Sequence, residues 1–426
     1  MKGDNTEMKT SRRNFLKVAA GTAGAATLGT AASCTAQEDV PEPIRNLQPY
    51  PGDFTPISDE ERLGRIEKAQ RLMTENGIDA MFLDSGTSMF YYTGVRWGQS
   101  ERMFAAVIPA NGELAWVCPN FEEERARELI RFGDDVRTWQ EHESPYRRVA
   151  EILNDRGFRR GTIGIEERCR FFLYDGVRQA TRAQFVSADP VSIGCRVIKS
   201  DNELALMQRA NNITIEAYRA AFQTVYEGMP REELSANIAA AHTALGASGR
   251  GGGQFGQASA FPHGSMQPQV LHEGDIILVD GGCGVDGYRS DISRTFVFGE
   301  PTQRQRDVWA VEKEAQTAAL EAAQVGAPCE DVDAAARAVI TGAGFGEDYE
   351  NFFHRVGHGI GLDGHEWINL VRGNTTPLAP GMCFSNEPGI YIYGEFGVRL
   401  EDCMYITEEG GRLFTPQAPS IDNCVA

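Results

Sequence analysis

Two aspartates in the C-terminal half of the chain are spaced for joint chemistry. Asp280 ends the apolar run 276–279, and Asp291 follows eleven residues later. The glycine-rich segment 281–287 allows a hairpin that would bring the two carboxylates side by side. Adjacent carboxylates repel each other, so they need a shared proton or bound cations. The pair therefore directs attention to further metal-binding side chains downstream.

Three such side chains follow in order, at His358, Glu387 and Glu401. Four carboxylates and one imidazole can hold two divalent ions, and such a set suits Mn²⁺, Co²⁺, Fe²⁺ or Zn²⁺ without selecting among them. Two ions ~3.5–4 Å apart can share a hydroxide at neutral pH and polarise a carbonyl group. Each residue alone has a structural interpretation, such as a turn or a surface acid. The five in order favour a site.

The order Asp, Asp, His, Glu, Glu, with the short motifs around each residue, resembles the pita-bread metallopeptidases. That group includes Xaa-Pro aminopeptidases, prolidases, methionine aminopeptidases and the metal-free creatinases. The resemblance covers residues 57 to about 410. It implies an α/β creatinase-like N-terminal domain followed by an α+β pita-bread catalytic domain. It also implies a dinuclear site, with Mn²⁺ as the expected metal, held by Asp280, Asp291, His358, Glu387 and Glu401.

The same resemblance assigns roles to individual residues. Asp291 and Glu401 are expected to bridge the metals, and Glu387 also to act as general acid/base. Catalytic roles in binding substrate, stabilising the tetrahedral intermediate and moving protons fall to His263, His354 and His365. Arg399, two residues before Glu401, is expected to bind substrate or to hold Glu401. Outside the motifs, His142, His242 and His272 are expected to be surface or hydrogen-bonded core residues, and Cys283 a small packed residue.

The expected reaction is hydrolysis of the amide bond before proline at the N-terminus of Xaa-Pro peptides, with a metal-bridging hydroxide as nucleophile. One alternative keeps the site but acts on a small non-peptide amide or related metabolite, because the segments 280–282 and 365–368 differ from the commonest family wording. Another is a non-catalytic periplasmic protein that binds metal or peptide. A third is an assembly scaffold. The resemblance also implies a homodimer.

The elements that position these residues fall into two domains. Residues 57–195 alternate between strand-like and helical segments, which predicts an α/β domain. Ser58 and Glu61 form a capping-box pattern that opens a helix to about Asn76, with Leu63 on its apolar face. Short apolar runs follow at 80–83, 89–92, 104–108, 114–117 and 162–165, with a helix over 121–131. Asn111-Gly112 predicts a hairpin between two of these runs.

Residues 197–426 form the second predicted domain. A capping box at Ser200 opens a long helix to about Tyr226. The pattern Gly-x-Pro-x-Glu-acid-aliphatic occurs at 228–234 and again at 326–332, which indicates two similar α+β halves. Residues 251–256 fit G-x-G-x-x-G but lack the strand and helix that a dinucleotide site requires. Residues 249–256 are interpreted as a mobile loop entering a strand that carries His263.

The N-terminus indicates export. Arg12-Arg13 precede an uncharged run of small residues, so residues 1–33 are typical of a twin-arginine signal. Cys34 gives an alternative, a lipid anchor, which would make the exported protein membrane-anchored rather than free in the periplasm. Residues 34–56 are expected to be a tether without a packed core. Residues 1–33 hold five basic and two acidic residues, so their removal would change the net charge from −19 to −22.

Composition excludes several classes of protein. The 60 acidic residues against 41 basic ones argue against a nucleic-acid partner, which would need a basic face. Nine cysteines in 426 residues are too few for a disulfide scaffold. The chain has no apolar stretch long enough to span a membrane. Composition thus allows an enzyme or a large binding protein, and the ordered ligand residues favour the enzyme.

Overall fold

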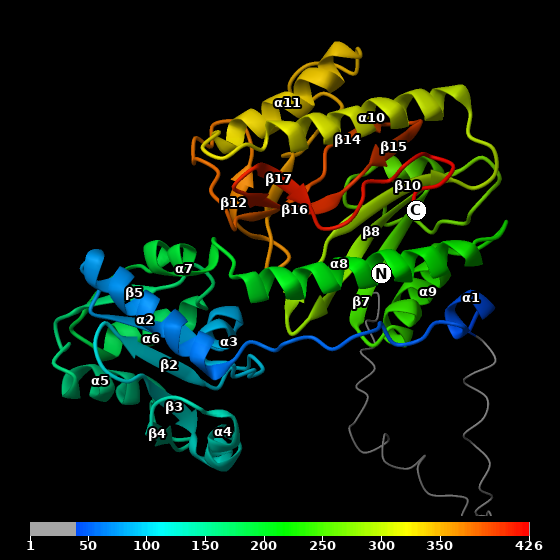
Figure 1. Ribbon diagram of the computed structural model, residues 1–426. Coiled ribbons are helices and arrows are strands. Elements are labelled where there is room, and N and C mark those ends of the chain that lie inside the picture. The colour runs from blue at the N-terminus through cyan, green and yellow to red at the C-terminus, as the bar shows by residue number, and fades with distance from the viewer. Residues whose placement is uncertain (1–39, 426) are drawn as a thin grey trace, which may run out of the picture. The chain divides into compact units, whose positions relative to one another are not determined.

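The computed structural model describes residues 40–425 (Figure 1). The signal 1–33 and the lipidation site Cys34 lie outside these residues. A mixed six-stranded sheet in the order β4-β3-β2-β1-β5-β6 forms the N-terminal part. Its strands are β1 (Ala80–Asp84), β2 (Ala105–Pro109), β3 (Ala115–Pro119), β4 (Asp135–Trp139), β5 (Thr162–Ile165) and β6 (Gln184–Ser187). Its helices are α2 (Asp59–Glu75), α3 (Thr87–Thr93), η1 (Asn120–Glu122), α4 (Glu123–Leu129), α5 (Pro145–Asp155), α6 (Phe171–Ala180) and α7 (Asp189–Arg196).

Local sequence signals explain this part well. Ser58 caps α2 by accepting from the Glu61 N–H at 3.1 Å. The Asn111-Gly112 turn joins β2 and β3, which pair antiparallel as predicted. Residues 89–92 belong to helix α3, and the predicted helix over 121–131 consists of η1 and α4. The prediction that Leu63 lies on the apolar face of α2 is wrong, because Leu63 is 46% exposed while Arg62 and Arg65 turn inward.

The C-terminal part contains a sheet in the order β10-β8-β7, with β9 paired to β8, a sheet in the order β12-β11-β13-β16-β17, and the hairpin β14-β15. The first sheet and the hairpin use β7 (Ser248–Phe255), β8 (Ile276–Val285), β9 (Tyr288–Arg289), β10 (Ile292–Val297), β14 (Gly389–Ile392) and β15 (Phe396–Arg399). The second sheet uses β11 (Gly357–Gly359), β12 (Glu366–Leu370), β13 (Cys383–Asn386), β16 (Asp402–Thr407) and β17 (Gly410–Leu413).

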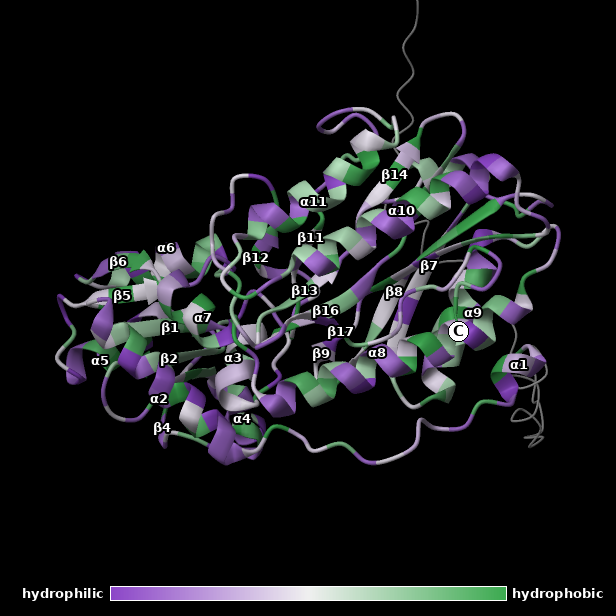
Figure 2. Cartoon of the chain, turned by 45° about the horizontal axis from the view of Figure 1, so that its top comes forward, coloured by the Kyte–Doolittle hydropathy of each residue, from purple (hydrophilic) through white to green (hydrophobic). Residues whose placement is uncertain are grey.

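Two pairs of long helices cover these sheets. Helices α8 (Asp201–Ala221) and α9 (Arg231–Ala244) lie on one side, and α10 (Gln303–Ala322) and α11 (Cys329–Gly342) lie on the other (Figure 1). Helices α8 and α10 carry both hydrophobic and hydrophilic residues (Figure 2), as expected of helices with one buried face. Short 3₁₀ helices occur at η2 (Phe222–Thr224) and η3 (Gly256–Ala260).

The repeated sequence pattern marks equivalent points in the two halves. Pro230 precedes α9 and Pro328 precedes α11, and both have φ −68° and ψ 144°. Each proline also makes an isolated antiparallel bridge, Pro230 to Val270 and Pro328 to Pro377. The prediction of two similar α+β halves therefore agrees with the structure at these helix starts.

Two predictions are corrected. Residues 41–56 are not an unpacked tether, since α1 (Glu42–Arg45) buries Ile44 and Arg209 of α8 donates to the backbone oxygens of Tyr50 and Pro51. The glycine-rich segment is not a loop but strand β7, and His263 follows η3 rather than lying on a strand. Glycine suits β7 because α9 packs closely on it: a Cβ at position 251 would lie 3.0 Å from Ile238.

Candidate functional site

The pairing of β8 with β10 forms the predicted hairpin and brings Asp280 and Asp291 together. Ser293 of β10 lies opposite Asp280 of β8, and Asp291 directly precedes β10. Glu401 follows β15 and joins the pair through Ser293, whose Oγ donates to Glu401 Oε2 at 2.7 Å. The Glu401 N–H also donates to the Ser293 backbone oxygen at 3.1 Å. Ser293 thus links Glu401 to the strand pair that positions Asp280 and Asp291.

His358 presents a nitrogen lone pair to these carboxylates. Its Nδ1 lies 3.1 Å from the backbone oxygen of Gly359, which can only accept, so Nδ1 carries the proton in the neutral ring. Nε2 then faces Glu387 Oε1 at 3.2 Å and Asp291 Oδ2 at 3.9 Å. A lone pair facing carboxylate oxygens needs a proton or a cation between them. A backbone carbonyl that fixes the tautomer is the usual support of a metal-bound imidazole.

The donor set fits a divalent cation. Ligand atoms of Asp291, His358 and Glu401 all lie within 4.8 Å of one another. Burial, together with the charge of Asp280, raises the pKa of Asp291 to about 8. Burial and the neighbouring Asp291 raise the pKa of Glu401 well above its ordinary value. Crowded buried carboxylates of this kind are stabilised in their charged form by bound cations.

A cavity of about 360 Å³ contains all nine residues singled out in the sequence. Its lining consists of Pro262, His263, Asp280, Asp291, His354, Arg355, His358, His365, Glu387, Arg399 and Glu401. The structure thus brings the expected residues together, and their roles in binding metal or substrate stay predictions. Pro262 and Arg355 are the additions to the predicted set.

His354 and Arg399 are linked through Tyr391, which the sequence did not single out. His354 Nδ1 donates to the backbone oxygen of Arg355 at 2.8 Å, so Nε2 accepts from the Tyr391 hydroxyl at 2.7 Å. Arg399 Nη1 donates to the same hydroxyl at 3.0 Å, and its Nη2 donates to Asp280 Oδ2 at 2.8 Å. Arg399 also donates to Ser293 Oγ at 2.9 Å, so it supports Asp280 directly and Glu401 through the serine.

His365 lies against His358, but its proton is on Nε2, whereas that of His358 is on Nδ1. The two rings stack with centroids 3.8 Å apart. Arg355 Nη2 lies 3.0 Å from His365 Nδ1, and a guanidinium can only donate, so Nδ1 accepts and Nε2 carries the proton. Burial and the nearby His358 and Arg355 lower the pKa of His365, which keeps the ring neutral. His365 is therefore a neutral N–H donor in this cavity.

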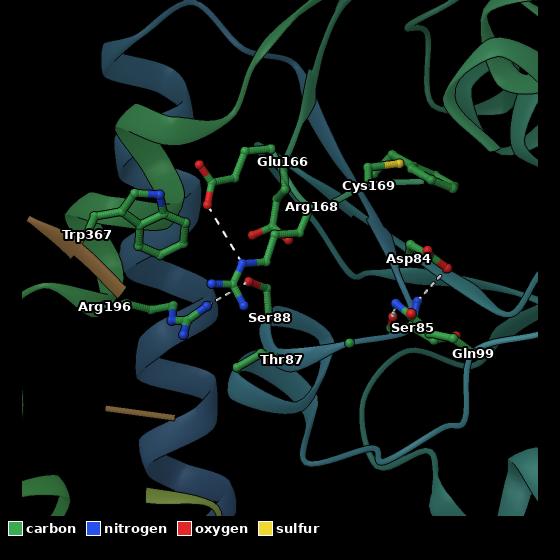
Figure 3. Close-up of a pocket in the computed structure, with 13 residues that line it drawn as sticks. Asp84, Ser85, Thr87, Ser88, Gln99, Glu166, Arg168, Cys169, Arg196 and Trp367 are labelled. Atoms are coloured by element: carbon green, nitrogen blue, oxygen red, sulfur yellow. Dashed lines mark hydrogen bonds and ion pairs between the residues drawn. The ribbon is translucent and has the colours of Figure 1, made fainter. Parts of the chain in front are cut away.

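A second cavity of about 260 Å³ lies beside the segment that carries His365 (Figure 3). Trp367 and Arg196 lie together in it, with the guanidinium carbon 5.0 Å from the ring centroid. Arg168 donates to the His365 backbone oxygen at 2.8 Å, and Lys199 Nζ lies 2.9 Å from Glu366 Oε2. Arg196 also pairs with Glu366. Two arginines of the N-terminal part, together with Lys199 from the segment between α7 and α8, thus hold the strand that follows His365.

The remaining histidines and Cys283 do not line this cavity. His242 is buried, with Nδ1 2.9 Å from the Ile238 backbone oxygen, and His272 is exposed beside Glu227. Cys283 is buried and packed as predicted, and the cysteines between residues 40 and 425 are all free. Within the same range, no helix is long and apolar enough to cross a membrane.

Comparison with known proteins agrees with this arrangement. Residues 205–408 match metallopeptidase family M24, residues 65–198 match the creatinase/prolidase N-terminal domain, and residues 9–29 match the twin-arginine translocation signal, which indicates export. An Xaa-Pro dipeptidase of Lactobacillus delbrueckii subsp. lactis is 32% identical over 82% of this chain and 96% of its own length. The Xaa-Pro dipeptidase of Pyrococcus furiosus is 32% identical over 82% of this chain and 97% of its own.

Solved structures give the same result. A dipeptidase from Pyrococcus horikoshii OT3 superimposes with a TM-score of 0.76 at 33% identity, covering 83% of this chain and 98% of that one. An X-Pro aminopeptidase from Thermotoga maritima MSB8 gives 0.74 at 28% identity, covering 83% and 98%. The similar proteins thus include a dipeptidase and an aminopeptidase. The chain belongs to metallopeptidase family M24 and carries the creatinase/prolidase N-terminal domain ahead of its catalytic domain.

Proposed function

We propose that the protein is an exported dinuclear-metal peptidase that hydrolyses the bond before proline at the N-terminus of Xaa-Pro peptides. The observation that carries the proposal is the meeting of four carboxylates and His358 with three further histidines in one cavity. Family M24 is a family of dinuclear divalent-metal enzymes. The names of the Lactobacillus and Pyrococcus relatives support proline as the residue after the cleaved bond.

The proposed ligands are Asp280, Asp291, His358, Glu387 and Glu401, with Mn²⁺ as the first metal to test. Bound at these residues, two divalent ions would activate water and polarise the scissile carbonyl. His365, a neutral donor, would hydrogen-bond the carbonyl oxygen as negative charge develops on it. Glu387, held by the Ser385 hydroxyl at 3.0 Å, would move a proton to the leaving nitrogen.

His354 acts in this scheme by position. Both of its ring nitrogens are occupied, by the Arg355 backbone oxygen and by Tyr391. The hydrogen bonds from Arg399 through Tyr391 fix the orientation of the His354 ring in the wall of the cavity. His263 is exposed on the loop after η3, and within residues 40–425 its ring makes no such contact, so it is proposed to meet the substrate.

Purified protein loaded with Mn²⁺ tests the proposal on a panel of Xaa-Pro, Xaa-Pro-Xaa and Xaa-Ala peptides. Cleavage restricted to the proline peptides is expected. Failure on the whole panel would reject a peptidase and leave the metabolite hydrolase or the binding protein. A metabolite screen separates these two: a hydrolase should turn over a substrate and lose that turnover in Glu387→Gln, whereas a protein that only binds peptide should keep its affinity. Dimerisation through the N-terminal domain stays an expectation from the family resemblance.

A further inference from the structure

The catalytic cavity contains two guanidinium groups whose partners differ. Arg399 is buried and already engaged with Asp280, Tyr391 and Ser293. Arg355 is half-buried at the cavity, and its side chain makes one polar contact within residues 40–425, the 3.0 Å bond to His365 Nδ1. No carboxylate of that range lies within ion-pair distance of it. Four of its five N–H donors thus remain free.

The position of Arg355 sets the distance to a substrate group. Arg355 contacts His365, and the His365 ring stacks on His358, so one imidazole separates the guanidinium from a proposed metal ligand. In a dipeptide the terminal carboxylate follows the scissile carbonyl by a single residue, a span of at most ~3.6 Å. Each added residue moves the carboxylate farther by up to the same amount. A cation one ring away from the ligands therefore matches the carboxylate of a dipeptide.

We propose that Arg355 binds the C-terminal carboxylate of the substrate and makes the enzyme prefer Xaa-Pro dipeptides to longer peptides. The inference rests on the proposed function and assigns the substrate class of the same site. A guanidinium suits this task because its planar fork matches a carboxylate. The bond to His365 orients the group without neutralising it, because the imidazole is uncharged. Arg355 is thus the specificity-determining residue of the pocket.

The test compares three substrates that differ only after proline: Ala-Pro, its C-terminal amide and Ala-Pro-Ala. For the wild-type holoenzyme, kcat/KM should be highest for Ala-Pro. Arg355→Gln should lower the Ala-Pro to Ala-Pro-amide ratio of kcat/KM on the order of 10- to 100-fold, the effect of losing a charge-assisted hydrogen bond. Arg355→Lys should restore part of the ratio. Using the ratio cancels any change that the substitution causes in His365.

Arg168→Gln is the matched control. Arg168 also donates to His365, at the backbone oxygen of that residue, but it lines the second cavity and not the one that contains Arg355. Its ratio should stay at the wild-type value. An unchanged ratio in Arg355→Gln, or a wild-type enzyme that cleaves acid and amide equally, would overturn the inference. If the proposed function is wrong, no proline substrate will be cleaved at all. Calorimetry then measures the affinities of the holoenzyme for Ala-Pro and for its amide. Equal affinities would overturn the inference.

Discussion

Glu366 is predicted to be a main support of the segment that carries His365. The Glu366 side chain is almost fully buried between Arg196, which ends helix α7, and Lys199, which lies just before helix α8. Burial alone would raise the pKa of Glu366, but Lys199 and Arg196 outweigh it and lower the pKa from 4.5 to about 2. A shift of this size corresponds to about 3 kcal/mol of folding stability. Breaking a buried ion pair typically costs the same order.

Glu366→Gln should therefore lower the free energy of unfolding by about 3 kcal/mol near neutral pH. Because the folded pKa is depressed, the contribution of the carboxylate is present above the unfolded value of 4.5 and is lost as the pH falls toward about 2. The difference between wild type and variant should shrink over that interval. Urea unfolding at pH 7, 5, 4 and 3 measures it. A difference below about 1 kcal/mol at pH 7, or one that does not change with pH, would refute the reasoning.

Three further predictions concern the cavity and the sheet beneath it. Tyr391→Phe removes the hydroxyl between Arg399 and His354, so kcat should fall about tenfold; an unchanged kcat in steady-state assays would show that the contact is not needed. Gly281→Ala should destabilise the β7–β8 pairing, because the new Cβ would lie 2.2 Å from the Arg250 backbone oxygen; thermal unfolding should show a lower Tm, and an unchanged Tm would contradict the close approach. Chelation should lower Tm as well as activity, and Mn²⁺ should restore both; a Tm indifferent to chelator would argue against a buried metal site.

The clustering of the chemistry-bearing residues in one cavity could be predicted from sequence, because strand and turn signals and the family motifs mark them. Asp280 and Asp291 flank a hairpin whose register follows from strand and turn signals, and the capping box at Ser200 forms as predicted. Glycine-rich β7 was missed because glycine is rare in strands. Glycine occurs in this strand for a tertiary reason. Without side chains, these residues let α9 pack on one face of the strand and let the β8 backbone approach closely. No local pattern carries that information.

The side-chain contacts that support the site could not be predicted from the sequence either, because no local pattern marks them. Tyr391 reaches His354 across 37 residues, and Glu366 meets Arg196 across 170. Such pairs depend on how the halves and domains pack. Arg355 had a weak signal, since it stands between His354 and His358 within a ligand motif. That Arg355 has no carboxylate partner within residues 40–425, whereas Arg399 is engaged, depends on the folded positions of distant side chains.

Metal content measured together with hydrolysis tests the central claim. The claim is that two metal ions, which serve peptide cleavage, are held by Asp280, Asp291, His358, Glu387 and Glu401. Wild-type protein should bind two Mn²⁺ per chain and cleave Ala-Pro. Asp291→Asn should lose both metal and activity, because Asp291 is proposed to bridge the ions. Asp307→Asn, an exposed aspartate on α10, should keep both. Two tightly bound ions in Asp291→Asn, or full activity in metal-free wild type, would contradict the account.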